Sequence, residues 1–176
     1  MSTFSKYING ILTFIERSTH ERVLPLAPVL FYDDFLGGAL DTTSVWTAID
    51  VSVAGNSTPL KSADAGNGVA RLPLDATSEA QESGLTFGDE RTFTLNRGLV
   101  FEARVALNVL PTGTGEMVWG LAGDKNAVAD TVAESIWFKA DGDGAIVVES
   151  DDTTAATTKD DQSTGVTVVA DEFRIY

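Results

Sequence analysis

Acidic side chains are the most numerous groups in this sequence that could do chemistry. Asp and Glu together number 26 of 176 residues. Carboxylate oxygens are the ligands that Ca²⁺ prefers, and one stretch brings several acids together: Asp141, Asp143, Glu149, Asp151 and Asp152. An EF-hand loop starting at Asp141 would place Ala145 at its fifth position and an Asp instead of a Glu at its twelfth. We therefore interpret these acids as a tight turn followed by solvated side chains, and we expect no metal ion.

The other residue types that commonly carry catalysis are scarce. The sequence contains no Cys, which excludes disulfides, thiolate metal sites and cysteine nucleophiles. A single histidine, His20, cannot make a multi-histidine metal site within one chain, and it lies in an N-terminal segment where a Ser-His-Asp triad is not expected. No glycine-rich loop followed by Lys is present to hold a phosphate. We expect no catalytic residues and no cofactor.

The three tryptophans leave one binding function open. Trp46, Trp119 and Trp137 could stack on sugar rings, as aromatic side chains do in lectins. Each of them, however, lies within an apolar run typical of a strand, and packing in the core is the more common fate of such residues. The sequence therefore favours three core tryptophans and keeps glycan binding as an alternative.

The charge is unevenly distributed along the chain. The formal net charge is −14, but residues 1–30 hold three basic and two acidic side chains, so residues 31–176 carry −15. Such a body would repel a phosphate backbone, which argues against a nucleic-acid partner. No run approaches the roughly 18 apolar residues that a membrane-spanning helix needs, and we expect no membrane partner.

The first thirty residues differ in pattern from the rest. Their apolar residues recur at i, i+3, i+4 and i+7, which predicts an amphipathic helix, although Gly10 in its middle costs about 1 kcal/mol relative to Ala. Pro25 and Pro28 then favour an extended segment. The alternative is that the apolar stripe packs on this chain's own core. We predict a helix and extended attachment arm that bind another subunit through Phe4, Tyr7, Ile8, Ile11, Leu12, Ile15, Val23, Leu24 and Leu26.

From residue 31 onward the pattern indicates a β-sandwich. Short apolar or alternating runs are separated by clusters of Gly, Asp, Asn and Thr, as in antiparallel all-β domains. We expect the polar stretch 151–165 to be an exposed loop, and the unfinished pattern at Tyr176 predicts that the natural chain continues. The predicted strands are 29–35, 44–53, 68–74, 83–88, 99–109, 116–122, 134–140, 144–150, 165–170 and 172–176.

Several motifs resemble a known family. Residues 31–42 (FYDDFLGGALDT), followed by Trp46, resemble the opening of concanavalin A-like jelly-roll domains of the laminarinase and laminin-G type. Residues 101–105 (FEARV) resemble one of the central strands of these domains, and the hairpin at 137–144 is similar to theirs. This resemblance implies two packed antiparallel sheets, so the fold class that we expect is an all-β, concanavalin A-like jelly-roll sandwich over residues 31–176.

The same resemblance raises the possibility of a glycosidase. Laminarinase-type members place two carboxylates on one strand as Glu-x-Asp-x-x-Glu, and retaining enzymes need these groups about 5 Å apart. The nearest match here begins at Glu149 but lacks the second Glu, and Glu79 and Glu82 have no Asp between them. The motif is missing, so we expect a protein that is not an enzyme.

A broader resemblance concerns the whole chain. Residues 21–35 (ERVLPLAPVLFYDDF) and 119–124 (WGLAGD) are similar in style to virion structural proteins of tailed bacteriophages, among which jelly-roll decoration proteins and fibres are frequent. This resemblance implies a capsid decoration or cement subunit on the exterior of the virion, present in the host cytoplasm during assembly. Its partners would be the major capsid protein and further copies of itself, most simply as a trimer. The alternative is a carbohydrate-binding module on a head fibre or tail.

Overall fold

The computed structural model of this protein is all-β, with thirteen strands and a 3₁₀ helix, η2 (Ala129–Thr131), among the residues that it describes. These are residues 3–8, 11–18, 22–23, 31–63, 65–75, 79–88, 90, 93, 99–123, 126, 128–140, 142, 144–154 and 158–176. The described residues include no helix that is long and apolar enough to cross a bilayer.

The N-terminal segment is a β-sheet, and our prediction of a helix there is wrong. Strands β1 (Thr3–Ile8) and β2 (Ile11–Glu16) pair antiparallel with Ile8 opposite Ile11, and β3 (Arg22–Val23) pairs with β2. The physical reason lies in the residue types. Phe, Tyr, Ile and Thr fill both strands and favour a pleated sheet, and the two residues between Ile8 and Ile11 are Asn-Gly, the strongest short-range signal for a hairpin.

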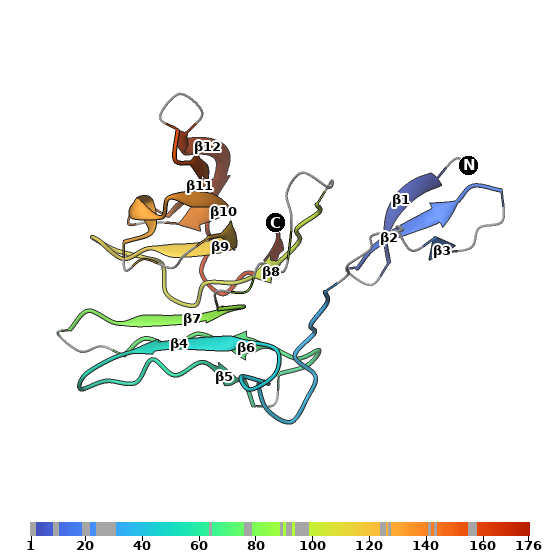
Figure 1. The fold of residues 1–176 in the computed structure, drawn as a ribbon. Coiled ribbons are helices and arrows are strands. Elements are labelled where there is room, and N and C mark those ends of the chain that lie inside the picture. Colours follow the sequence, from blue (N-terminus) through green and yellow to red (C-terminus); the bar gives the residue numbers. More distant parts are fainter. Residues whose placement is uncertain are drawn as a thin grey trace.

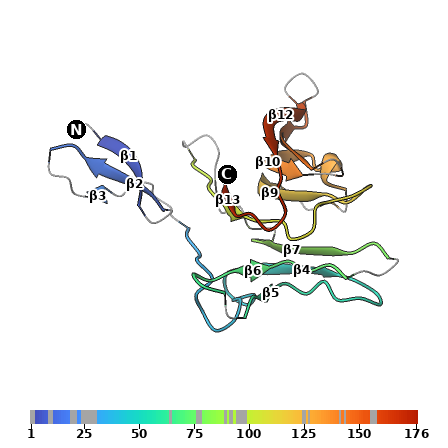
Figure 2. The ribbon, with the colours of Figure 1, turned by 180° about the vertical axis from the view of Figure 1, so that it is seen from behind.

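The N-terminal sheet, as we call β1–β3, is separate from the rest of the molecule. Its strands pair with one another and with no other described strand. Figures 1 and 2, which are opposite views, both show it apart from the body that begins at residue 31. Residues 24–30 lie outside the described residues, so the predicted boundary near residue 30 stays a prediction.

The largest sheet of the body has four antiparallel strands in the order β12-β11-β10-β9. In Figure 1 it lies beside a layer made of shorter strand pairs, β4 with β7 and β5 with β6, while β8 pairs with β13 near the C-terminus. The strand bounds are β4 (Thr47–Val51), β5 (Leu60–Lys61), β6 (Ala70–Arg71), β7 (Glu82–Thr86), β8 (Arg104–Val105), β9 (Met117–Ala122), β10 (Glu134–Ala140), β11 (Ala145–Asp152), β12 (Lys159–Thr167) and β13 (Arg174–Ile175).

Most of the predicted strands are confirmed, and two predictions about the body are wrong. Residues 31–35 form no strand, because the Asp33 carboxylate accepts the backbone N–H of Phe35, whose φ of 53° is left-handed. The predicted loop 151–165 contains much of β12, an edge strand whose residues from Lys159 to Gly165 are exposed. An exposed edge strand buries no apolar face, and it therefore lacks the alternation by which strands are recognised.

One face of the four-stranded sheet covers the main hydrophobic core. Its buried residues come from β9, β10, β11 and two flanking segments, namely Leu107, Trp119, Ala140, Ile146 and Val168. The rings of Trp119, Phe138 and Tyr176 lie within 6.0 Å of one another and close this core toward the C-terminus. Because Phe138 and Ala140 face this core, the alternate residues of β10 face the other side of the sheet.

Candidate functional site

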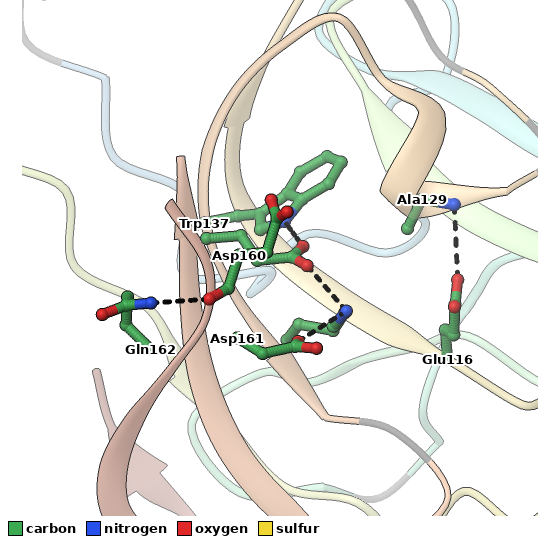
Figure 3. A network of polar contacts seen from close by, with 8 residues as sticks. Glu116, Ala129, Trp137, Asp160, Asp161 and Gln162 are labelled. Atoms are coloured by element: carbon green, nitrogen blue, oxygen red, sulfur yellow. Dashed lines mark hydrogen bonds and ion pairs between the residues drawn. The ribbon is translucent and has the colours of Figure 1, made fainter. Parts of the chain in front are cut away.

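The side of β10 that faces away from the core carries a network of polar side chains, shown in Figure 3. The Lys139 ammonium lies 2.7 Å from Oε1 of Glu149 and 2.9 Å from Oδ1 of Asp161. The indole Nε1 of Trp137 donates a hydrogen bond of 2.7 Å to the other carboxylate oxygen of Glu149. We call these four residues the Lys139 cluster. It spans three adjacent strands, with Glu149 on the central one.

Burial makes the Lys139 cluster unusual. The exposed fraction is 2% for Lys139, 5% for Glu149 and 6% for Trp137, whereas the Asp161 side chain is 60% exposed. Removing an ammonium and a carboxylate from water costs several kcal/mol per ion, and their attraction offsets this only when the geometry is good. Both oxygens of Glu149 are satisfied here, which is the condition that such a buried pair must meet.

The strands position these side chains through close packing. Gly120 of β9 is opposite Trp137, and a Cβ at that glycine would lie 2.6 Å from Cα of Trp137. Beside the indole, a cavity of about 10 Å³ is lined by Trp137, Glu149 and Asp160 together with residues of β10, β11 and η2. This is close to the smallest volume that holds one water molecule. Asp160 thus reaches the same side of the sheet as its neighbour Asp161.

Lys139 and Asp161 were not predicted from the sequence as members of a site. Two charged residues in strand centres were the available signal: Lys139 follows Ile136-Trp137-Phe138, and Glu149 follows Val147-Val148. A charge within such a run is either paired or exposed. The partner Asp161 gave no signal, because it lies in a stretch that reads as a polar loop.

The predicted attachment residues fall on all three strands of the N-terminal sheet. Ile15 is buried, at 9% exposure, and its neighbour across the strands, Phe4, is half-buried. The backbone register pairs Tyr7 with Leu12. The structure places the predicted residues as follows: Phe4, Tyr7 and Ile8 on β1, Ile11, Leu12 and Ile15 on β2, and Val23 on β3, with Leu24 and Leu26 outside the described residues.

The three tryptophans differ in burial and in the groups that they contact. Trp119 and Trp137 are both buried, at 9% and 6% exposure. Trp119 lies in the main core, as predicted, whereas Trp137 faces the other side of the sheet and belongs to the Lys139 cluster. Trp46 is half-buried, stacks on Phe87 with ring centroids 4.9 Å apart, and donates from Nε1 to Asp33 at 2.7 Å.

Of the acids predicted to be solvated, the structure describes Glu149, Asp151 and Asp152. Within the described part of the chain, no group of three or more acidic or histidine side chains has the arrangement of metal ligands. Glu149 is 5% exposed and belongs to the Lys139 cluster, so the prediction that it is solvated is wrong. Asp151 and Asp152 accept backbone N–H groups of Thr153 and Thr154. Asp141 and Asp143 lie outside the described residues, as does His20.

Glu79 is a structural carboxylate. It accepts hydrogen bonds from the Ser52 hydroxyl at 2.6 Å and from the backbone N–H groups of Val53 at 2.8 Å and Gly55 at 2.7 Å. The Ser52 hydroxyl and the Gln81 amide, with smaller help from backbone N–H groups, hold the pKa of the Glu79 carboxyl well below its ordinary range. Its lone pairs are therefore used to fix the loop after β4.

A second cavity in the body differs from the one beside Trp137 in its volume and in its lining residues. It has a volume of about 310 Å³, and its lining residues are Phe31, Tyr32, Asp33, Phe35, Gly37, Ala39, Leu40, Asp41 and Val45. Tyr32 at its rim is 64% exposed, and Phe31 is 37% exposed. The Asp41 carboxylate in the wall accepts the N–H groups of Thr43 and Ser44 through Oδ1. Aromatic and acidic groups thus line one shallow cavity, which we call the Tyr32 cavity.

Comparisons with protein-family models, with curated proteins and with solved structures find no match to this chain. Its functional assignment therefore rests on the residues and geometry described above.

Proposed function

We propose that this protein is a non-enzymatic structural subunit of a bacteriophage virion, a capsid decoration or cement protein that attaches through its N-terminal sheet. The observation that carries this proposal is the separateness of β1–β3, which pair only among themselves in the described topology and lie apart from the body in both views (Figures 1 and 2). A lone three-stranded sheet buries little apolar surface, so a partner surface would stabilise it.

The composition of the N-terminal sheet supports attachment to protein. Phe4 and Phe14 are only half-buried in the isolated subunit. The register places Phe4 opposite Ile15 and Phe14 opposite Ser5, so each face of the sheet carries a phenylalanine that a partner surface could cover. The body in this proposal is a jelly-roll sandwich that faces outward, where its charge of −15 keeps it soluble and discourages random association. Binding to the assembled shell alone would stabilise that shell by mass action.

The test is co-sedimentation with capsids that lack this protein. Deletion of residues 2–28 should leave a folded body that stays in the supernatant, whereas the full chain should pellet with the capsids. A milder variant, Phe14→Ser, should weaken binding, and Ser5→Ala, which changes an exposed residue of β1, is its matched control. Undiminished pelleting of the deleted protein would contradict the role of the N-terminal sheet.

The Tyr32 cavity favours a second candidate function, a carbohydrate-binding module. Its volume of about 310 Å³ is at the lower end of the range for small-ligand sites, and an exposed tyrosine ring next to carboxylates is a common way to hold a sugar. Binding on a glycan array that Tyr32→Ala abolishes and Val53→Ala preserves would favour this function. Val53 is 96% exposed and does not line the cavity, which makes it a suitable control.

A further inference from the structure

An irregularity in strand pairing brings two aspartates opposite one glutamate. Val148 of β11 pairs with Gln162 of β12, and Ser150 pairs with Lys159. Between these pairs, β11 contributes only Glu149, whereas β12 contributes both Asp160 and Asp161. Two residues opposite one define a β-bulge, a feature that redirects side chains and is common beside functional sites.

The bulge carries backbone strain at the residue that contacts the lysine. Asp161 has a φ of 46°, in the left-handed region that L-residues seldom adopt. In a regular strand, consecutive residues face opposite sides of a sheet. Here Asp160 lines the cavity beside Trp137, and Asp161 reaches the Lys139 ammonium. The strained turn is therefore what places a carboxylate of the edge strand against a lysine two strands away.

The resulting arrangement places one amine in contact with both a carboxyl group and a proton acceptor. Nζ of Lys139 is 2.9 Å from Oδ1 of Asp161 and 2.7 Å from Oε1 of Glu149. The Trp137 indole donates to the second oxygen of Glu149, and the first oxygen of Glu149 accepts from the lysine. We propose that Lys139 and Asp161 condense spontaneously into an intramolecular isopeptide bond, with Glu149 transferring the protons.

The reaction balances without any co-reactant. Glu149 takes a proton from the Lys139 ammonium, and the neutral Nζ attacks Cγ of Asp161 to form a tetrahedral intermediate. Glu149 then delivers that proton to an oxygen on Cγ, accepts the second proton from the nitrogen, and passes it to the same oxygen. One N–C bond forms, one C–O bond breaks, and one water molecule leaves. One ammonium and one carboxylate become a neutral amide, so the net charge is unchanged.

Proximity and burial favour formation of the isopeptide bond. A well-oriented intramolecular pair reacts as though its partner were present at about 10⁵–10⁸ M, which offsets the unfavourable condensation of an amine and an acid in water. Lys139 and Glu149 are almost completely buried, and a neutral amide is less costly to bury than an ammonium. A buried ion pair alone contributes little to stability. The bond would join β10 to β12 across β11 and clamp the edge strand to the sheet.

Intact-mass spectrometry of the full chain tests this proposal directly. The purified protein should be lighter than its sequence mass by one water molecule, and digestion should release a branched peptide that joins Lys139 to Asp161. A wild-type protein that keeps its full sequence mass after prolonged incubation would overturn the proposal. So would a branched peptide that joins Lys139 to Asp160.

Variants separate the three roles and include matched controls. Lys139→Arg and Asp161→Ala remove a bonding partner, and Glu149→Gln removes the proton acceptor, so all three should have their full sequence masses. Lys159→Arg and Asp160→Asn change neighbouring residues of β12 and should still lose one water molecule. Loss of water in Lys139→Arg, or its absence in Lys159→Arg, would contradict the assignment. The wild-type mass decides the matter even if a variant fails to fold.

Discussion

At the scale of single residues, the acidic side chains of this protein act mainly as hydrogen-bond acceptors. The Asp50 carboxylate accepts the hydroxyls of Ser57 and Thr58, which lower the pKa of its carboxyl group, the Ser57 bond having the larger effect. The Glu79 carboxylate likewise accepts hydrogen bonds from the Ser52 hydroxyl and the Gly55 backbone N–H, at the two ends of the loop from Ser52 to Gly55. These contacts stabilise the ionised carboxylates in the folded state, and they make the body depend on pH.

Substitution of Glu79 should change the acid stability of the body. Its pKa is lower in the folded chain than in the unfolded chain, so its contribution to stability is fully present above the unfolded value of about 4.3 and is lost as the pH falls below it. Glu79→Gln should lower the free energy of unfolding at pH 7, and this difference should narrow as the pH falls below about 4.3.

Urea unfolding at several pH values, followed by tryptophan fluorescence, measures this effect. Glu134→Gln is the matched control, because Glu134 is an exposed residue of β10. Equal loss of stability at neutral and acidic pH in Glu79→Gln would show that the ionised carboxylate is not the stabilising form.

At the scale of elements, most strands of the body could be predicted from the sequence, and the N-terminal sheet could not. Apolar residues at 4, 7, 8, 11, 12 and 15 fit a helical period, but two paired strands that are apolar on many positions produce the same spacing. The residues that decide between these structures are Asn9 and Gly10. In a helix their low propensity is a cost, whereas between two strands the same pair favours a tight turn.

The strands of the candidate site also differ in whether the sequence predicts them. Strand β10 agrees with the prediction at both ends, because Ile136, Trp137 and Phe138 give it a strong apolar signal. The first part of β12, residues 159–164, was missed because its exposed residues give no such signal, and Asp161 was missed with it. The contact between Lys139 and Asp161 depends on a bulge in the pairing of β11 with β12. The register of two paired strands cannot be read from the residues of one strand alone.

The packing of β9 on β10 gives a prediction for Gly120. A Cβ at this position would lie 2.5 Å from the backbone oxygen of Ile136 and 2.6 Å from Cα of Trp137, and backbone atoms cannot move aside as a flexible side chain can. We expect Gly120→Ala to destabilise the body by about 1–3 kcal/mol, as overpacking does in other cores. Gly113→Ala is an informative comparison, because a Cβ there meets nothing within 4 Å and only its φ of 62° is unfavourable. A thermal melt in which Gly120→Ala unfolds at the wild-type temperature would contradict this view of the packing.

The separateness of the N-terminal sheet gives a prediction about folding. All three tryptophans lie in the body, so tryptophan fluorescence reports the unfolding of the body alone. Since β1–β3 pair with no other described strand, deletion of residues 2–28 should leave the midpoint of that transition unchanged. A large fall in the midpoint would mean that the N-terminal residues complete the core of their own subunit, and it would remove the basis for an attachment role.

At the scale of the whole molecule, charge and apolar surface are divided between two parts. Residues 31–176 carry −15, while the first thirty residues are close to neutral and supply the unpartnered sheet. Under the proposed function, two such molecules would repel each other through their bodies and attract each other through their N-terminal sheets. Repulsion between exposed charges is screened by salt, whereas apolar contact is not weakened by it.

Self-association through the N-terminal sheet should therefore strengthen as salt is added. Raising the ionic strength from about 0.01 M to about 0.1 M shortens the Debye length from about 30 Å to about 10 Å, which screens one acidic body from another. Sedimentation velocity at a fixed protein concentration should show the full chain moving from monomer toward oligomer over this range. The protein without residues 2–28 should remain monomeric at both salt concentrations, because it keeps the charge and lacks the apolar sheet. If the shortened protein associated equally well, the contact between copies would have to lie on the body, where the described aromatic residues Tyr32 and Phe173 are 64% and 43% exposed.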